Sequence, residues 1–158
     1  MMPNYHIGID PGKTGYIVAI DGDGSIAWSL PMPETATVLA SKLKDYADCY
    51  FIVERQFAMH GQGLSSTFTI AQGYGEILGV LAGIGAGCNL VRSQDWQKVM
   101  LRGEGKAKGR DLKRLYVAVA ERMWPTISFR GPKGGAQDGK AAAALIAEYG
   151  RRVSAGRA

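Results

Sequence analysis

The chain has 158 residues, of which 46% are hydrophobic and 21% charged, a composition typical of a single globular domain with a proper core. Its net charge of +5 favours a polyanionic partner. The two cysteines, Cys49 and Cys88, lack metal-ligand spacing and exclude a disulfide framework, which indicates a reducing compartment.

Hydrophobic periodicity and turn residues predict a mixed sheet with helices packed on it. Strands are expected at 5–10, 16–21, 25–30, 49–54 and 88–91. Helices are expected at 34–46, 64–84, 93–100, 111–123 and 138–152. The first three strands form an antiparallel meander, and strands then alternate with helices. The sequence therefore predicts one α/β domain over residues 1–152 and a disordered tail at 153–158.

The stretch IGIDPGKTGYIVAI contains most of a phosphate-binding loop, at Gly8, Gly12 and Lys13. That loop needs four residues between its first glycine and the Gly-Lys-Ser/Thr, and a helix must follow it. Here three residues intervene and strand-forming residues follow, which argues strongly against a phosphate loop. We interpret Gly8 and Gly12 as hairpin and close-approach glycines, Lys13 as facing solvent or DNA, and Asp10 as the functional residue.

Three carboxylates stand where predicted strands end or a predicted helix begins. Asp10 ends the first strand, Glu54 ends the fourth, and Asp138 begins the last helix. Such positions gather at the rim of a sheet, where ligands bind. Converging carboxylates stay ionised beside a cation, and oxygen ligands select Mg²⁺ or Mn²⁺. Two such ions roughly 3.5–4 Å apart stabilise the attacking and leaving oxygens of a phosphodiester, which is the arrangement of a nuclease site. Taken singly, Asp10 also suits a turn and Asp138 a helix N-cap.

The segments IGIDPGKTGYIVAI, FIVERQF and QDGKAAAALIAEYGRR resemble the RuvC-type Holliday-junction resolvases. The resemblance covers nearly the whole chain, and its ending is most similar to the phage, bacterial and plastid branch. It implies a ribonuclease-H-like mixed five-stranded sheet flanked by helices. It also implies a homodimeric, metal-dependent endodeoxyribonuclease that resolves four-way DNA junctions by paired symmetric nicks. Asp10, Glu54 and Asp138 match its metal ligands, which implies two Mg²⁺ or Mn²⁺ ions per site.

The chain departs from the resolvase pattern at Ala142. In this branch a fourth acid is expected four positions after the first helix acid, and residues at that spacing share one helix face. Two explanations are open: a deliberate substitution that permits binding without cleavage, or a natural, non-catalytic junction-binding protein. The other three acids are intact, which favours the first. In either case we expect the chain as it stands to cleave weakly or not at all.

Basic residues are concentrated between positions 98 and 114. This segment has seven basic and two acidic residues, and the difference of five equals the net charge of the whole chain. Its glycines indicate a mobile loop that orders on phosphates with salt-dependent affinity, and the alternative is an ordinary solvated loop. The expected DNA contacts here are Lys98, Arg102, Lys106, Lys108, Arg110 and Lys113.

The loop after Glu54 is expected to reach DNA as well. Phe57 lies three residues further on, and an exposed ring beside a metal site would stack on bases or wedge between them. The resemblance implies a junction wedge at this offset, and the alternative is a ring packed on the core. Gln62, Ser65 and Ser66 are candidates for phosphate contacts, although either serine also suits a helix cap.

Two helices have informative faces. The helix at 34–46 is expected to turn inward Val38, Leu39 and Leu43. In the helix at 64–84, glycines recur every four residues and share one face: Gly75, Gly79 and Gly83. Because glycine inside a helix costs about 1 kcal/mol relative to alanine, we expect close packing there, within the chain or against a second subunit.

Three weaker expectations remain. Lys133 shortly precedes Asp138 and is a candidate for balancing charge in the transition state. Kinases of the actin and sugar-kinase type share an opening Asp-x-Gly hairpin, but they need a second domain for which 158 residues leave no room, so no nucleotide cofactor is expected. Residues 1–6 contain no signal peptide, and no apolar run is long enough to span a membrane, so we expect a cytoplasmic protein without a membrane partner.

Overall fold

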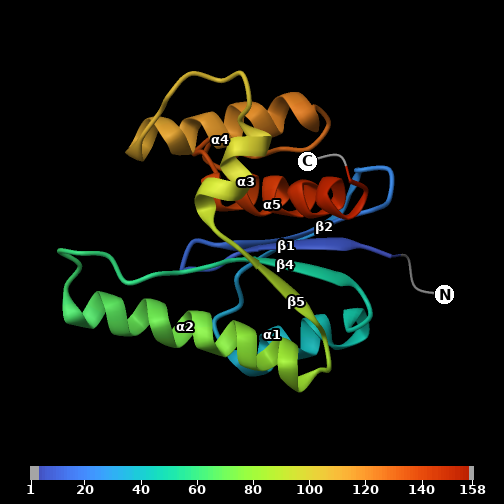
Figure 1. Cartoon of the computed structure of the whole chain (residues 1–158), viewed down its shortest axis with the longest axis vertical. Coiled ribbons are helices and arrows are strands. Elements are labelled where there is room, and N and C mark those ends of the chain that lie inside the picture. The colour runs from blue at the N-terminus through green and yellow to red at the C-terminus, as the bar shows by residue number, and fades with distance from the viewer. Residues whose placement is uncertain (1–3, 157–158) are drawn as a thin grey trace.

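The computed structural model describes residues 4–156, which form a five-stranded sheet with helices on both faces (Figure 1). The strands are β1 (His6–Asp10), β2 (Tyr16–Ile20), β3 (Ile26–Pro31), β4 (Tyr50–Glu54) and β5 (Cys88–Val91). The helices are α1 (Ala36–Leu43), α2 (Leu64–Gly83), α3 (Ser93–Met100), α4 (Gly109–Met123) and α5 (Asp138–Ser154), with the short 3₁₀ helix η1 (Lys44–Tyr46) after α1. The predicted α/β class with a mixed five-stranded sheet is confirmed.

The sheet has the strand order β3-β2-β1-β4-β5. β1 and β2 are antiparallel, as are β2 and β3, because tight turns join them. β4 and β5 run parallel to β1, since helices form the crossovers between them. The carboxyl ends of β1 and β4 therefore meet at one edge, with Ile9 paired to Val53.

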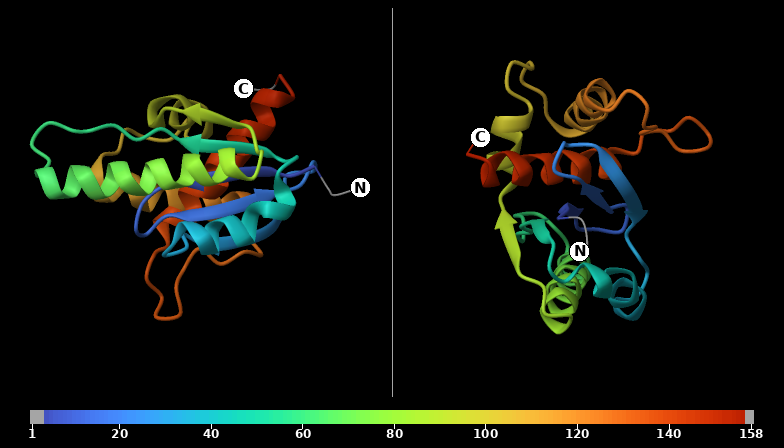
Figure 2. Two further views of the ribbon diagram at one scale, coloured as in Figure 1. Left: turned by 90° about the horizontal axis from the view of Figure 1, so that it is seen from below. Right: turned by 90° about the vertical axis from the view of Figure 1, so that its right-hand side faces the viewer.

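Two hydrophobic cores lie on opposite faces of the sheet. α5, backed by α3 and α4, covers one face, and α1 and α2 cover the other (Figures 1 and 2). Leu39 and Leu43 of α1 are buried in the second core, as predicted. Val38 is 45% exposed, so its predicted inward orientation is wrong. A residue next to Leu39 is turned about 100° around the helix, and the sheet covers too narrow a stripe to bury both.

α5 lies directly on β1 because glycine and alanine leave room for it. A Cβ added to Gly8 would stand 2.2 Å from the carbonyl oxygen of Ala143 and 2.4 Å from the backbone nitrogen of Ala147. At the start of α5, a Cβ on Gly139 would stand 2.2 Å from the carbonyl oxygen of Thr14. These close approaches fix the beginning of α5 beside the turn between β1 and β2, and they confirm Gly8 as a close-approach glycine.

The first half of α2 projects beyond the sheet, together with the loop that precedes it (Figure 2). Phe68 in this half is 69% exposed. A Cβ added to Gly75, Gly79 or Gly83 meets no atom of the described residues within 4 Å. Close packing of this glycine face within the chain is therefore wrong, and packing against a second subunit stays a prediction.

α5 ends at Ser154, two residues into the segment predicted to be a tail, and the predicted disorder of that tail stays a prediction. Ala155 caps this helix, and positions 157–158 of the predicted tail lie outside the described residues. Over residues 4–156, no helix combines the length and the apolar character needed to cross a membrane.

Candidate active site

Three structural elements bring the predicted acids to one edge of the sheet. Asp10 is the last residue of β1 and Glu54 the last of β4, and these strands are parallel neighbours. Asp138 is the first residue of α5, whose start is held against the turn after β1. The helix N-cap is Gln137, so the interpretation of Asp138 as only an N-cap is wrong.

Electrostatics show that the three acids interact. Burial raises the pKa of Asp10 well above its ordinary value, and the charges of Glu54 and Asp138 raise it further, while Lys113 opposes the shift. Burial also raises the pKa of Tyr116, and the same three carboxylates add to that shift. The negative charges of these acids therefore raise the pKa of both Asp10 and Tyr116, which indicates that the acids lie near one another.

A lysine partly compensates this cluster, and it is not the one that sequence reasoning proposed for catalysis. The ammonium nitrogen of Lys113, on α4, lies 3.0 Å from Oδ2 of Asp138. Lys133 lies exposed in the loop between α4 and α5, and its predicted catalytic role stays a prediction. Lys113 was expected only as a DNA contact, because the packing of α4 against α5 cannot be read from sequence separation.

α3 and α4 contribute three residues that sequence reasoning missed. The indole Nε1 of Trp96 donates a 2.6 Å hydrogen bond to Oε2 of Glu54. The Trp96 and Tyr116 rings lie 5.1 Å apart, and Gln97 Nε2 donates a 2.6 Å hydrogen bond to the Tyr116 hydroxyl. The only sequence signal was a tryptophan inside an amphipathic helix, which predicts burial and names no partner.

Ala142 lies one helical turn after Asp138 and is 4% exposed. It belongs to the hydrophobic core that also contains Trp96, with Tyr116 packed against it. A side chain longer than alanine at this position has little access to water and must turn toward its neighbours. Whether an acid there would face the other three stays a prediction.

The oxygen donors fit a hard divalent cation in chemistry and charge. Three coupled carboxylates face one ammonium group, which leaves an excess of negative charge at the edge of the sheet. In residues 4–156, however, no three His, Cys, Asp or Glu side chains are gathered closely enough to hold an ion as they stand. Ligation therefore requires side-chain rotation from the arrangement described.

The loop between β4 and α2 places an aromatic ring in the solvent. Phe57 is 55% exposed, so packing of its ring into the core is excluded, and the guanidinium of Arg55 lies 5.2 Å from the ring centroid. Gln62 accepts a hydrogen bond from the backbone of Met59. The N-cap of α2 is Gly63, so Ser65 and Ser66 are not helix caps, and both are exposed in its first turn.

The basic segment borders the acids through α3 and α4, which supply Trp96 and Lys113. Its two acids are already paired, Glu104 with Arg122 and Asp111 with Arg114. The six predicted DNA contacts are all exposed: Lys98, Arg102, Lys106, Lys108, Arg110 and Lys113. The segment therefore presents uncompensated positive charge next to a negative cluster.

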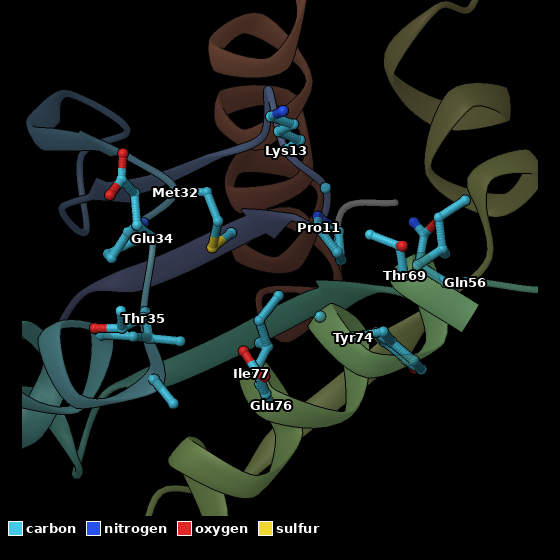
Figure 3. A pocket seen from close by; sticks show the side chains of 16 residues that line it. Pro11, Lys13, Met32, Glu34, Thr35, Gln56, Thr69, Tyr74, Glu76 and Ile77 are labelled. Atoms are coloured by element: carbon cyan, nitrogen blue, oxygen red, sulfur yellow. The ribbon is translucent and has the colours of Figure 1, made fainter. Parts of the chain in front are cut away.

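A cleft of about 770 Å³ lies between α1 and α2, on the face of the sheet that α5 does not cover. Figure 3 shows residues from the loop after β1, the connection from β3 to α1, and α2 around it, including Lys13, Met32 and Ile77. None of the three acids lines this cleft. We place the candidate active site at the acids rather than in this cleft, because the acids supply the oxygen ligands that a divalent cation prefers.

Comparison with known proteins identifies the fold. No family model matches the chain, and no curated protein matches it either. Among solved structures, the chain is similar to Thermus thermophilus RuvC in complex with Holliday junction substrate, with a TM-score of 0.61, 12% identity and coverage of 96% of this chain and 95% of the other. The fold is ribonuclease-H-like. A second Thermus thermophilus RuvC structure matches with a TM-score of 0.54, 16% identity and coverage of 94% and 95%.

Proposed function

We propose that the protein is a structure-selective DNA endonuclease that acts on four-way junctions, in a form whose cleavage is impaired by Ala142. One observation carries the proposal: Asp10, Glu54 and Asp138, from three separate segments, form one electrostatically coupled cluster at a sheet edge. The similarity in fold to RuvC structures, one of them bound to a Holliday junction, supports branched DNA as the substrate.

The three carboxylates would hold Mg²⁺ or Mn²⁺, two ions per site. When bound, such ions supply charge stabilisation for the attacking and leaving oxygens of a phosphodiester. The chain's own residues orient the site: the two parallel strands hold Asp10 and Glu54 side by side, and Trp96 fixes one oxygen of Glu54. Lys113 balances charge beside Asp138 until a cation arrives.

DNA would lie across the basic segment and the loop that carries Phe57. Exposed lysines and arginines neutralise phosphates, which makes the affinity fall steeply with salt. The exposed Phe57 ring supplies a surface that stacks on a base or wedges between two. Gln62, Ser65 and Ser66 follow Phe57 in the chain and would offer polar groups to the DNA backbone.

A homodimer would place two such sites on one junction. The projecting half of α2 carries exposed Leu64 and Phe68. The glycine face in the second half of the same helix (Gly75, Gly79 and Gly83) is open. Apolar side chains beside small residues let two helices approach closely. The expected setting is the cytoplasm of a bacterial or phage-infected cell.

A second candidate is a natural junction-binding protein that does not cut. Ala142 favours it, since the site lacks the fourth acid, and the Lys113–Asp138 ion pair already satisfies one of the remaining three. Both candidates predict junction binding. They differ in whether an acid at position 142 generates cleavage.

The test uses a labelled synthetic four-way junction with Mg²⁺ and measures binding and nicking together. The chain as it stands, Ala142→Glu and the shorter Ala142→Asp are compared with Ala118→Glu, which adds the same charge at an exposed position of α4. We expect all four to bind and only the two position-142 variants to nick symmetrically. Binding without nicking in every variant would favour the second candidate, and robust cleavage by the parent chain would refute the impairment.

A further inference from the structure

The hydrogen bond between Trp96 and Glu54 joins residues 42 positions apart in the sequence. Trp96 is fully buried, and its indole N–H is the group it directs at the sheet edge. At 2.6 Å, the bond is short for an N–H···O contact.

The two oxygens of the Glu54 carboxylate differ in their hydrogen-bond partners. Oε2 accepts from the indole, whereas Oε1 accepts no hydrogen bond from the described residues. A hydrogen bond to one oxygen restricts the rotation of the carboxylate and leaves the second oxygen available to a ligand. Partners of this kind orient metal ligands in proteins, and their loss weakens metal binding.

The indole itself is held by a second contact between α3 and α4. The Tyr116 ring lies 5.1 Å from the Trp96 ring at a tilt of 51°, and Gln97 donates to the Tyr116 hydroxyl at 2.6 Å. Because Gln97 follows Trp96 directly on α3, this hydrogen bond ties the same helix to α4 beside the indole. The ring contact and this hydrogen bond together restrict the rotation of the Trp96 indole.

We propose that Trp96 is a positioning residue of the nuclease site, whose indole N–H holds Oε2 of Glu54 and leaves Oε1 to bind a divalent cation. The proposal rests on the function proposed above. The Gln97–Tyr116 contact supports it by holding the indole in place. α3 thereby carries both Trp96, which contacts Glu54, and Lys98, the first residue of the basic segment.

The same core provides a matched control in Trp124. Its Nε1 also donates a hydrogen bond, at 2.8 Å, but to the backbone carbonyl of Gly24. Trp124 is 7% exposed and contacts none of the three acids through this bond. Trp96→Phe and Trp124→Phe each remove one buried donor and part of one ring, so they separate loss of packing from loss of positioning.

The experiment measures binding of Mn²⁺ alone, by electron paramagnetic resonance of the free ion, together with thermal unfolding. We expect Trp96→Phe to weaken Mn²⁺ binding about tenfold, the lower limit typical of such partners, and Trp124→Phe to leave it unchanged while costing similar stability. Tyr116→Phe, which removes the hydroxyl and keeps the ring, is expected to weaken binding to a smaller extent.

Each outcome bears on the proposal. Equal Mn²⁺ affinity in Trp96→Phe and Trp124→Phe overturns it. If Trp96→Phe does not fold, unchanged affinity in Tyr116→Phe overturns it instead. Undetectable Mn²⁺ binding by the parent chain overturns both this inference and the metal site. A selective loss in Trp96→Phe, combined with no nicking by Ala142→Glu, supports the positioning role while rejecting the nuclease function.

Discussion

The ammonium nitrogen of Lys113 lies 3.0 Å from Oδ2 of Asp138, so a cation belonging to the chain occupies one side of the acidic cluster. This contact joins the basic segment to the acids and makes the two surfaces interdependent. Both side chains keep some exposure to solvent, which limits the strength of the pair.

Lys113→Gln is expected to strengthen Mn²⁺ binding about threefold, because an exposed ion pair is worth up to about 1 kcal/mol and competes with the cation. The same variant should weaken junction binding, since it removes a phosphate contact. Calorimetric titration measures both. Lys133→Gln serves as the control, and equal effects of the two substitutions on Mn²⁺ affinity would contradict the assignment of Lys113.

Asp10→Asn is expected to raise the melting temperature by a few degrees near pH 7.5 without divalent cations. Because the pKa of Asp10 is raised in the folded state, its stabilising contribution is fully present below its ordinary value of 3.8 and is lost as the pH rises through the folded pKa. The advantage of the variant should therefore shrink toward acidic pH. Thermal unfolding across this range checks it, with the exposed Asp48→Asn as the control.

Gly8→Ala is expected to destabilise the protein by about 1–3 kcal/mol or more, as overpacked cores do. The new Cβ would meet backbone atoms of α5 at 2.2 and 2.4 Å, and backbone cannot move aside without displacing the helix that carries Asp138. Urea denaturation measures the change. Gly22→Ala, where a Cβ meets no described atom within 4 Å, should change the free energy of unfolding far less.

Phe57→Ala is expected to leave the free energy of unfolding within about 0.5 kcal/mol of the parent value, because the ring is largely exposed. Junction binding should lose about 1–3 kcal/mol if the ring stacks on a base. Fluorescence of 2-aminopurine placed at the branch point reports the stacking. The same loss of affinity in Val38→Ala, an exposed residue of α1, would argue against a specific wedge.

Gly79→Ala separates an open helix face from a dimer interface. Alanine should stabilise the α2 helix of the monomer by about 0.5–1 kcal/mol, because its Cβ meets no described atom. If the glycine face packs against a second copy, self-association in sedimentation equilibrium should weaken at the same time. Gly73→Ala lies on another face of α2 and should leave association unchanged.

Local patterns in the sequence determined much of the fold and part of the candidate site. Alternating strand residues and turns predicted all five strands, and strand ends identified Asp10 and Glu54. Such predictions succeed because the periodicity of apolar residues sets which elements form, and a polar residue after an apolar strand is left at the rim.

Tertiary structure alone decided which side chains meet at that rim. Trp96 reaches Glu54 because α3 packs against α5 on the sheet, and Lys113 rather than Lys133 reaches Asp138 because α4 lies on α5. It also left the glycine face of α2 open, where the sequence suggested only that something must pack closely. The physical reason is that periodicity records how far a residue is buried, whereas its partner depends on how separate elements are placed in space.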